Sequence, residues 1–306
     1  MSLARALRGA ALALAASCAL PAQADSSPEL CDRQHEPTAA ERDTILRLAA
    51  VVKDELEASG AEVALVARSG TDLRRFGQRY SHAGVVLRES ANAPWSVRQL
   101  YYACDERRPR LYDQGMAGFL TGASDLEHGR IALVFLPAGQ ADPIARVALD
   151  DAQSLAVLGS TYSANAYPFS TRYQNCNQWV MELVATAWGG LDDATADVRA
   201  QAQAWLEGQD YEPTEFQVPW HPLEWIVGML TLLHNDDHPP SDLAGNRYTV
   251  SMPASIEAFV QAHVAGATRL EICHVGRHIV LHSGWDELGD ACEPTGDDRV
   301  IDLSPD

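Results

Sequence analysis

The sequence predicts a single domain of the α+β class, and three observations lead to this prediction. Helix-type and strand-type patterns are intermixed along the chain, without the regular strand–helix–strand alternation of α/β folds. No internal repeat, and no linker long enough to separate two domains, interrupts these patterns. The 306 residues are also enough to build one sizeable hydrophobic core.

The first half of the chain combines one long helix with several strands. Thr38 opens a capping-box pattern, and apolar residues then recur with helical spacing as far as Gly60, which ends the helix. Shorter helices are predicted at 113–120 and at 142–158, with Pro143 in the first turn of the latter. Runs of apolar or β-branched residues predict strands at 62–69, 79–88, 95–102 and 130–136. The second and third of these strands are expected to form a hairpin.

The second half begins with a loop rich in Tyr, Ser and Asn at 160–173, which leads into a helix that ends at Gly189. Residues 208–225 are rich in Pro and Trp and are expected to wrap around the body. The acidic tail from Gly289 is expected to be ordered only as far as Cys292. Further helices are predicted at 192–207, 223–234 and 255–265, and strands at 248–251 and within 268–281.

The N-terminus has the pattern of a secretory signal peptide. Arg5 and Arg8 precede an Ala/Leu-rich run, and Ala22-Gln23-Ala24 supplies a small-x-small cleavage site, so cleavage is predicted after Ala24. Lipidation at Cys18 is the less favoured alternative. The remainder has no apolar run of the roughly 20 residues that span a bilayer. We therefore expect a periplasmic or secreted protein made of residues 25–306.

The charge balance excludes two classes of partner. The chain carries 23 basic and 42 acidic residues, a net charge of −19. Such a surface repels nucleic-acid phosphates and anionic lipid surfaces. No cofactor is predicted, and the sequence gives no indication of the oligomeric state.

Five cysteines follow the signal sequence, an odd number in a compartment that favours disulfides. Proximity suggests that Cys273 pairs with Cys292, and that Cys31 pairs with Cys104. This pairing would leave Cys176 free, although connectivity cannot be deduced from sequence alone.

Cys176 opens the helix that follows the 160–173 loop, and Asn175 is a plausible N-cap. A thiol there meets the positive end of the helix dipole and free backbone N–H groups, and both favour the nucleophilic thiolate. The alternative is a buried or disulfide-bonded structural cysteine. His82, at the start of a strand and followed by two small residues, is a candidate partner or else an ordinary hydrogen-bonded histidine.

Two histidine clusters are weak candidates for metal sites. His234 and His238 flank Asn and Asp residues, but Pro239-Pro240 follows at once, so a solvated acidic loop is the simpler interpretation. His274, His278 and His282 recur every four residues, which places them on one face of either a helix or a strand. Polar packing between strands is the default there, and no metal site is predicted.

The His-strand and the distant Asn-Cys helix, Tyr80-Ser-His-Ala-Gly-Val and Asn175-Cys-Asn-Gln-Trp-Val, resemble the circularly permuted NlpC/P60 group of papain-like proteins. This group includes lecithin:retinol acyltransferase-like enzymes. The arrangement also resembles DUF2145, a bacterial family of uncharacterised secreted proteins. The resemblance implies a papain-like core at about 60–190, an antiparallel sheet packed against the cysteine-bearing helix, and helical C-terminal additions over 191–306.

The resemblance also implies roles for individual residues. Cys176 would attack an acyl carbon and His82 would act as its ion-pair partner and acid. Gln99 is the preferred third residue, ahead of Tyr101, because an amide oxygen can accept the second imidazole N–H, although the family more often has His, Asn or Glu there. The backbone N–H of Cys176 and a side chain, Gln174 or Tyr173, would bind the oxyanion. Residues expected to contact the substrate are Tyr101, Tyr173, Gln174 and Asn175.

Three classes of function remain open. The first is a thiol hydrolase or acyltransferase that acts on an amide or ester of cell-wall peptide or lipid. The second is a non-catalytic cell-envelope binding module with a degenerate papain-like cleft. The third is a periplasmic metal-binding protein that uses the histidine-rich C-terminal half.

Overall fold

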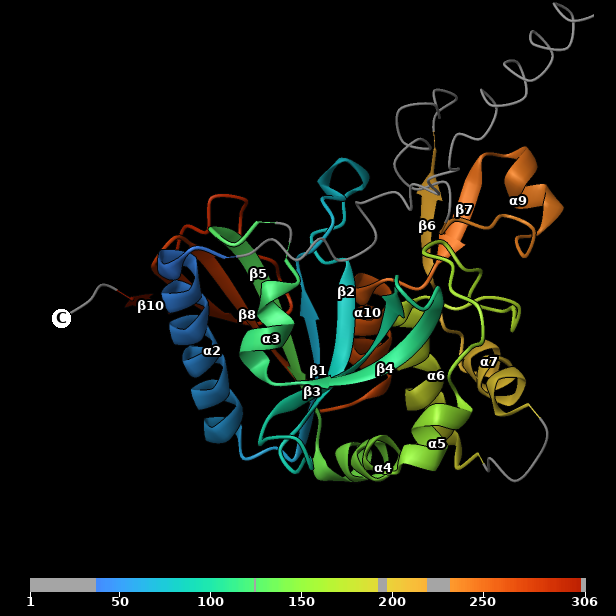
Figure 1. Ribbon diagram of the computed structural model, residues 1–306, viewed down its shortest axis with the longest axis horizontal. Helices are drawn as coiled ribbons and strands as arrows, with labels where there is room; N and C mark the ends of the chain where they lie inside the picture. Colours follow the sequence, from blue (N-terminus) through green and yellow to red (C-terminus); the bar gives the residue numbers. More distant parts are fainter. Residues whose placement is uncertain (1–36, 124, 192–196, 219–231, 304–306) are drawn as a thin grey trace, which may run out of the picture.

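The computed structural model describes residues 37–123, 125–191, 197–218 and 232–303. The predicted signal peptide, Cys31 and most of the predicted helix 223–234 lie outside these residues. Within them the fold is α+β, as predicted: a large antiparallel sheet with helices on both faces (Figure 1). Among the helices of the described residues, none is both long and apolar enough to cross a membrane.

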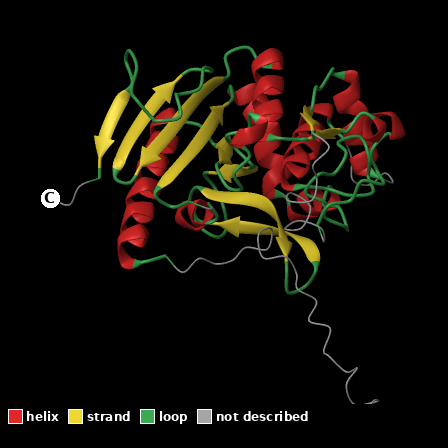
Figure 2. Cartoon of the chain, turned by 90° about the horizontal axis from the view of Figure 1, so that it is seen from above, coloured by secondary structure: helices red, strands yellow, loops and turns green. Residues whose placement is uncertain are grey.

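The large sheet is formed by β1 (Val63–Arg68), β2 (His82–Leu87), β3 (Ser96–Ala103), β4 (Arg108–Gln114), β5 (His128–Phe135), β8 (Thr268–Val275), β9 (His278–Ser283) and β10 (Arg299–Asp302). Their spatial order is β10-β9-β8-β5-β1-β2-β3-β4, and all neighbours are antiparallel. Figure 2 shows these strands side by side from above, with the C-terminus beyond one edge. A small second sheet pairs β6 (Thr214–Gln217) with β7 (Arg247–Val250).

Helices cover the sheet on both sides. The helices are α2 (Ala39–Ser59), α3 (Met116–Thr121), α4 (Ala138–Leu149), α5 (Asp151–Ala156), α6 (Cys176–Gly189), α7 (Val198–Gly208), α9 (Pro240–Ala244) and α10 (Pro253–His263), besides one 3₁₀ turn, Arg74–Phe76. One core cluster joins α2 and α3 to one face, and another joins α4, α6, α7 and α10 to the other. The central strands β1 and β2 are buried on both faces, which explains their continuous apolar runs.

Several predicted elements are confirmed. Thr38 and Glu41 form the capping box of α2, and Gly60 ends that helix with φ +68°. Strands β2 and β3 form the predicted hairpin. At α6, the side chain of Asn175 accepts a hydrogen bond from the backbone N–H of Gln178, so Asn175 is the N-cap as expected.

Other elements differ from the prediction. Residues 108–114 form β4, and the predicted helix at 113–120 begins only at Met116. The predicted helix 142–158 is two helices, because Asp150 caps the start of α5, accepting bonds from the backbone N–H groups of Ala152 and Gln153. Pro143 lies inside α4 and not in its first turn, since this helix begins at Ala138.

The C-terminal part also differs from the expected helical addition. β8 pairs with β5 along its whole length, so the main sheet includes strands from both ends of the chain. The tail does not end its ordered structure at Cys292, because β10 pairs with β9. The core and the extension predicted from the resemblance therefore share one sheet.

Candidate functional site

The described cysteines are either disulfide-bonded or free, as their odd number suggested. Cys273 and Cys292 form a disulfide with a Cα–Cα distance of 5.7 Å, and Cys104 is also disulfide-bonded. Cys31, the predicted partner of Cys104, lies outside the described residues. Among the cysteines of the described residues, Cys176 is the free one, and it is buried at the first residue of α6.

The sulfur of Cys176 lies in a polar but enclosed position. It is 3.7 Å from Oδ1 of Asn177, and the backbone N–H groups of Asn177 and Ala83 interact with it. Burial raises the pKa of the thiol to about 11, and the lowering effects of the Arg68 charge and these N–H groups do not offset it. At this pKa the thiol keeps its proton at neutral pH, because loss of hydration outweighs the helix terminus.

His82 makes the hydrogen bond that the sequence predicted. Its Nε2 lies 2.7 Å from Oε1 of Gln99, and Nε2 of Gln99 donates to Oε1 of Gln114, also at 2.7 Å. Because the amide N–H₂ of Gln99 is committed to Gln114, its oxygen faces the imidazole, and Nε2 of His82 carries the proton. This tautomer leaves Nδ1 unprotonated and able to act as a base.

The imidazole of His82 and the sulfur of Cys176 lie on opposite sides of the sheet at the start of β2. The His82 ring packs on Tyr101 and Phe119, with ring centroids 4.8 and 6.0 Å away, on the side of the sheet covered by α3. Ala83, the next residue, belongs to the core cluster of α6 on the other side. No hydrogen bond joins the sulfur of Cys176 to the imidazole, two groups that the structure describes.

Arg68, at the end of β1, is a member of the site that the sequence reasoning missed. Its side chain is buried, donates hydrogen bonds to the carbonyl of Gly122 and the hydroxyl of Tyr101, and lies 5.2 Å from the centre of the Phe119 ring. Burial and then the charge of Arg68 lower the pKa of His82 to about 3. An arginine directly after the apolar run Val63–Ala67 is the signal that could have identified it.

The residues expected to contact the substrate are occupied by internal contacts. Gln174 is wholly buried, and its amide bonds the carbonyl of Val157, the carboxylate of Glu182 and the N–H of Gly159, so it cannot also serve as an oxyanion donor. The ring of Tyr173 stacks on His234 at 4.3 Å. Asn175 caps α6, and the hydroxyl of Tyr101 accepts from Arg68.

A buried polar network that was not predicted holds the loop before Cys176. Glu182 of α6 is wholly buried and accepts two bonds from Arg199 of α7, at 2.7 and 3.1 Å. Gln174, Gln178 and Gln203 also donate to its carboxylate. Arg199 in turn donates to the carbonyls of residues 171 and 173. The network therefore fixes the chain that leads into the first turn of α6.

The histidines of the second half have individual roles in packing. Nε2 of His238 lies 2.7 Å from the carbonyl of Asn165, and Nδ1 of His282 lies 2.7 Å from the carboxylate of Asp298. In the four described ranges, no three His, Cys, Asp or Glu side chains come together as metal ligands would.

The fold and site define a disulfide-bonded α+β protein with one free, buried thiol at a helix N-terminus. A structural disulfide of this kind fits an extracellular or periplasmic protein. The family of uncharacterised proteins conserved in bacteria called DUF2145 matches residues 55–260, and the chain belongs to this family. No curated protein and no solved structure matches the chain.

Proposed function

We propose that the protein is a cysteine hydrolase or acyltransferase of the cell envelope, with Cys176 as nucleophile, His82 as base and Gln99 as the residue that orients His82. The hydrogen bond between His82 Nε2 and Gln99 Oε1 is the observation that carries this proposal. It fixes the imidazole tautomer and leaves Nδ1 as the basic nitrogen. The arrangement resembles that of the permuted papain-like enzymes named above.

In the proposed reaction, Nδ1 of His82 takes the proton of the Cys176 thiol while sulfur bonds to the acyl carbon of the substrate. The amide C–N or ester C–O bond breaks, and the imidazolium returns the proton to the leaving nitrogen or oxygen. Water then cleaves the thioester in a hydrolase, and another nucleophile does so in an acyltransferase. The backbone N–H of Cys176 is the proposed oxyanion donor.

The reaction requires the imidazole to turn toward the sulfur, which breaks its hydrogen bond to Gln99, so Gln99 orients the imidazole in the resting state. The β2–β3 ladder runs only from Val85 to Leu87, but β1 pairs with β2 as far as His82, so the backbone is held and only the side chain of His82 can turn. The conformation described here is then a resting state, in which the thiol with a pKa of about 11 keeps its proton.

Cell-wall peptide or lipid is the proposed substrate class. The chain belongs to a bacterial family, its disulfide fits an exported protein, and its net charge of −19 disfavours polyanionic partners. The protein would then cleave amide or ester bonds of molecules in the cell envelope.

A non-catalytic binding module is the second candidate. The pKa of His82, lowered to about 3, and the raised pKa of the Cys176 thiol favour it, because a neutral pair that does not touch has no nucleophile at neutral pH.

Alkylation of Cys176 by iodoacetamide across the pH range separates the two candidates. For an enzyme, we expect wild-type alkylation to include a component that titrates far below pH 11, and His82→Ala to lose it. Hydrolysis of amide and ester panels should fall by about 10²–10⁴-fold in His82→Ala, less in Gln99→Leu, and vanish in Cys176→Ala. His278→Ala, an exposed histidine on β9, is the matched control. A single titration near pH 11 in every variant, without hydrolysis, supports the binding module.

A further inference from the structure

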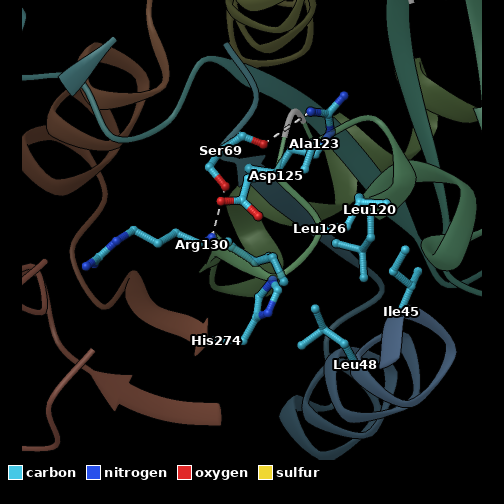
Figure 3. Close-up of a pocket in the computed structure, with 12 residues that line it drawn as sticks. Ile45, Leu48, Ser69, Leu120, Ala123, Asp125, Leu126, Arg130 and His274 are labelled. Atoms are coloured by element: carbon cyan, nitrogen blue, oxygen red, sulfur yellow. Dashed lines mark hydrogen bonds between the residues drawn. The ribbon is translucent and has the colours of Figure 1, made fainter. Parts of the chain in front are cut away.

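The thiol of Cys176 is enclosed, and the residue is only 7% exposed. The pocket in Figure 3 does not reach it. That pocket lies on the other face of the sheet, beside Leu48, Leu126 and His274, and none of its described lining residues comes from α6 or β2. The behaviour of the thiol therefore depends on the few polar groups that contact the sulfur directly.

Asn177, the next residue of α6, links the sulfur to the chain at the start of β2. Its Nδ2 donates to the carbonyl of Ser81 at 3.3 Å and to the sulfur of Met252 at 3.8 Å. A carbonyl can only accept a hydrogen bond, so the amide nitrogen faces Ser81 and the amide oxygen is turned to Cys176, with Sγ and Oδ1 3.7 Å apart. Asn177 therefore offers the thiol an acceptor.

This amide has little freedom to turn. Asn177 is 2% exposed, and Ser81 is itself fixed, because its backbone N–H donates to the carbonyl of Arg68 at the end of β1. Met252 is also buried, as the N-cap of α10. If the amide turned over, Oδ1 would face the Ser81 carbonyl, which sets two acceptors against each other without a proton between them.

The thiol has one proton to donate, because burial raises its pKa to about 11 and it stays protonated at neutral pH. Oδ1 of Asn177 is an acceptor within reach of that proton. The backbone N–H groups of Asn177 and Ala83 interact with the sulfur itself. Ionisation would leave a negative sulfur against the negative end of the amide dipole, so the contact with Oδ1 favours the thiol over the thiolate.

We propose that Asn177 is a positioning residue that holds the thiol of Cys176 in its resting direction, with the Sγ–H proton donated to Oδ1 and Nδ2 anchored on Ser81. The inference deepens the proposed function, because it names the group that keeps the nucleophile protonated at rest, and its meaning for catalysis rests on that function. In the proposed reaction, the Sγ–H bond must turn away from Oδ1 before the proton can pass to Nδ1 of His82.

Raman spectroscopy of the S–H stretch tests the proposal, because this band lies at lower frequency when the proton is hydrogen-bonded than when it is free. The Cys176 band is assigned by its absence in Cys176→Ser. In Asn177→Leu, which keeps a similar shape without the acceptor, the band should move to higher frequency. In Asn92→Leu, at an exposed position of a loop, the band should keep its wild-type frequency.

Asn177→Asp provides a second test that does not require the leucine variant to fold. An ionised carboxylate accepts the same proton more strongly than an amide, so the S–H band should move to lower frequency as the pH rises through the titration of the introduced carboxyl. The band of Asn92→Asp should not change over that range. Above that titration, alkylation of Cys176 by iodoacetamide at a fixed pH should be at least about tenfold slower in Asn177→Asp than in wild type, since a neighbouring negative charge raises the pKa of the thiol.

The proposal is overturned if the band has the same frequency in wild type and Asn177→Leu, if it does not titrate in Asn177→Asp, or if the Asn92 variants shift it equally. None of these spectra depends on turnover. A shifted band without any hydrolysis of the amide and ester panels would therefore end the proposed function and leave the role of Asn177 in place. Hydrolysis with an unshifted band would do the reverse.

Discussion

At the scale of the residue, the site shows how burial competes with local stabilisation. The N-cap and the free N–H groups at the start of α6 are present, yet the Cys176 thiol has a raised pKa because its sulfur is enclosed. His82 follows the same rule, since burial and the nearby Arg68 disfavour the imidazolium more than Gln99 favours it. Reactivity at this site therefore depends on how water and substrate reach the pair.

His82 gives a prediction about pH. Its folded-state pKa of about 3 lies below the ordinary value of 6.5, so between these pH values the unfolded chain binds a proton that the folded protein does not. Stability should therefore fall as the pH is lowered from 6.5, by roughly 1.4 kcal/mol per pH unit for this histidine, and His274 should add to the slope. Urea unfolding at several pH values measures it.

His82→Gln should reduce this slope by the equivalent of about one proton. The matched control His278→Gln, at an exposed position of β9, should keep the wild-type slope. If His82→Gln and wild type lose stability in parallel, the imidazole is protonated in the folded state and the resting arrangement described above is wrong.

At the scale of the element, a buried charge pair joins α6 to its neighbour α7. Glu182 and Arg199 join α6 to α7, and the same cluster holds the loop that ends at Asn175. Burying these two charges costs solvation free energy, and burial accordingly raises the pKa of Glu182. Its role is to fix where Cys176 lies relative to β2.

Glu182→Leu should destabilise the protein by about 3–5 kcal/mol, because it leaves the Arg199 guanidinium buried and unpaired. The double variant Glu182→Leu/Arg199→Leu removes both charges and should recover much of this loss. Chemical denaturation of Glu182→Leu, Arg199→Leu and the double variant gives a double-mutant cycle for the pair. Strictly additive losses would show that the two charges do not stabilise each other.

At the scale of the whole molecule, the C-terminal strands extend the open sheet on one side. β8, β9 and β10 continue the sheet beyond β5, and the Cys273–Cys292 disulfide ties β8 to the segment before β10. The N-terminal helix α2 covers the same end of the sheet, where Arg277 contacts Asp43 and Arg299 contacts Glu55. Both ends of the chain therefore contribute to one core.

Replacing both Cys273 and Cys292 by Ser should lower the free energy of unfolding by about 3 kcal/mol, since the bond closes a loop of 19 residues. Equilibrium unfolding of oxidised wild type and of the double variant measures this difference. Equal stabilities would mean that packing of β8 and β9 alone holds this end of the sheet.

Patterns that depend on neighbours in the chain were predictable. The capping box of α2, the N-cap at Asn175, the β2–β3 hairpin and the Cys273–Cys292 bond all depend on short-range spacing. The hydrogen bond of His82 to Gln99 agrees with the third residue that the family resemblance implied. β4 was not predicted, because Pro109 and several charged residues disguise a strand at the edge of the sheet.

By itself the sequence indicated the fold class and, through an odd number of cysteines, a free Cys176, and the resemblance to a known family implied Gln99 as the partner of His82. Only the tertiary structure decided that β8 lies beside β5, that Arg68 is buried near His82, and that the imidazole faces away from α6. Sequence spacing sets local geometry through the backbone. Burial, which controls the pKa of Cys176 and of His82, is created by segments far apart in the chain.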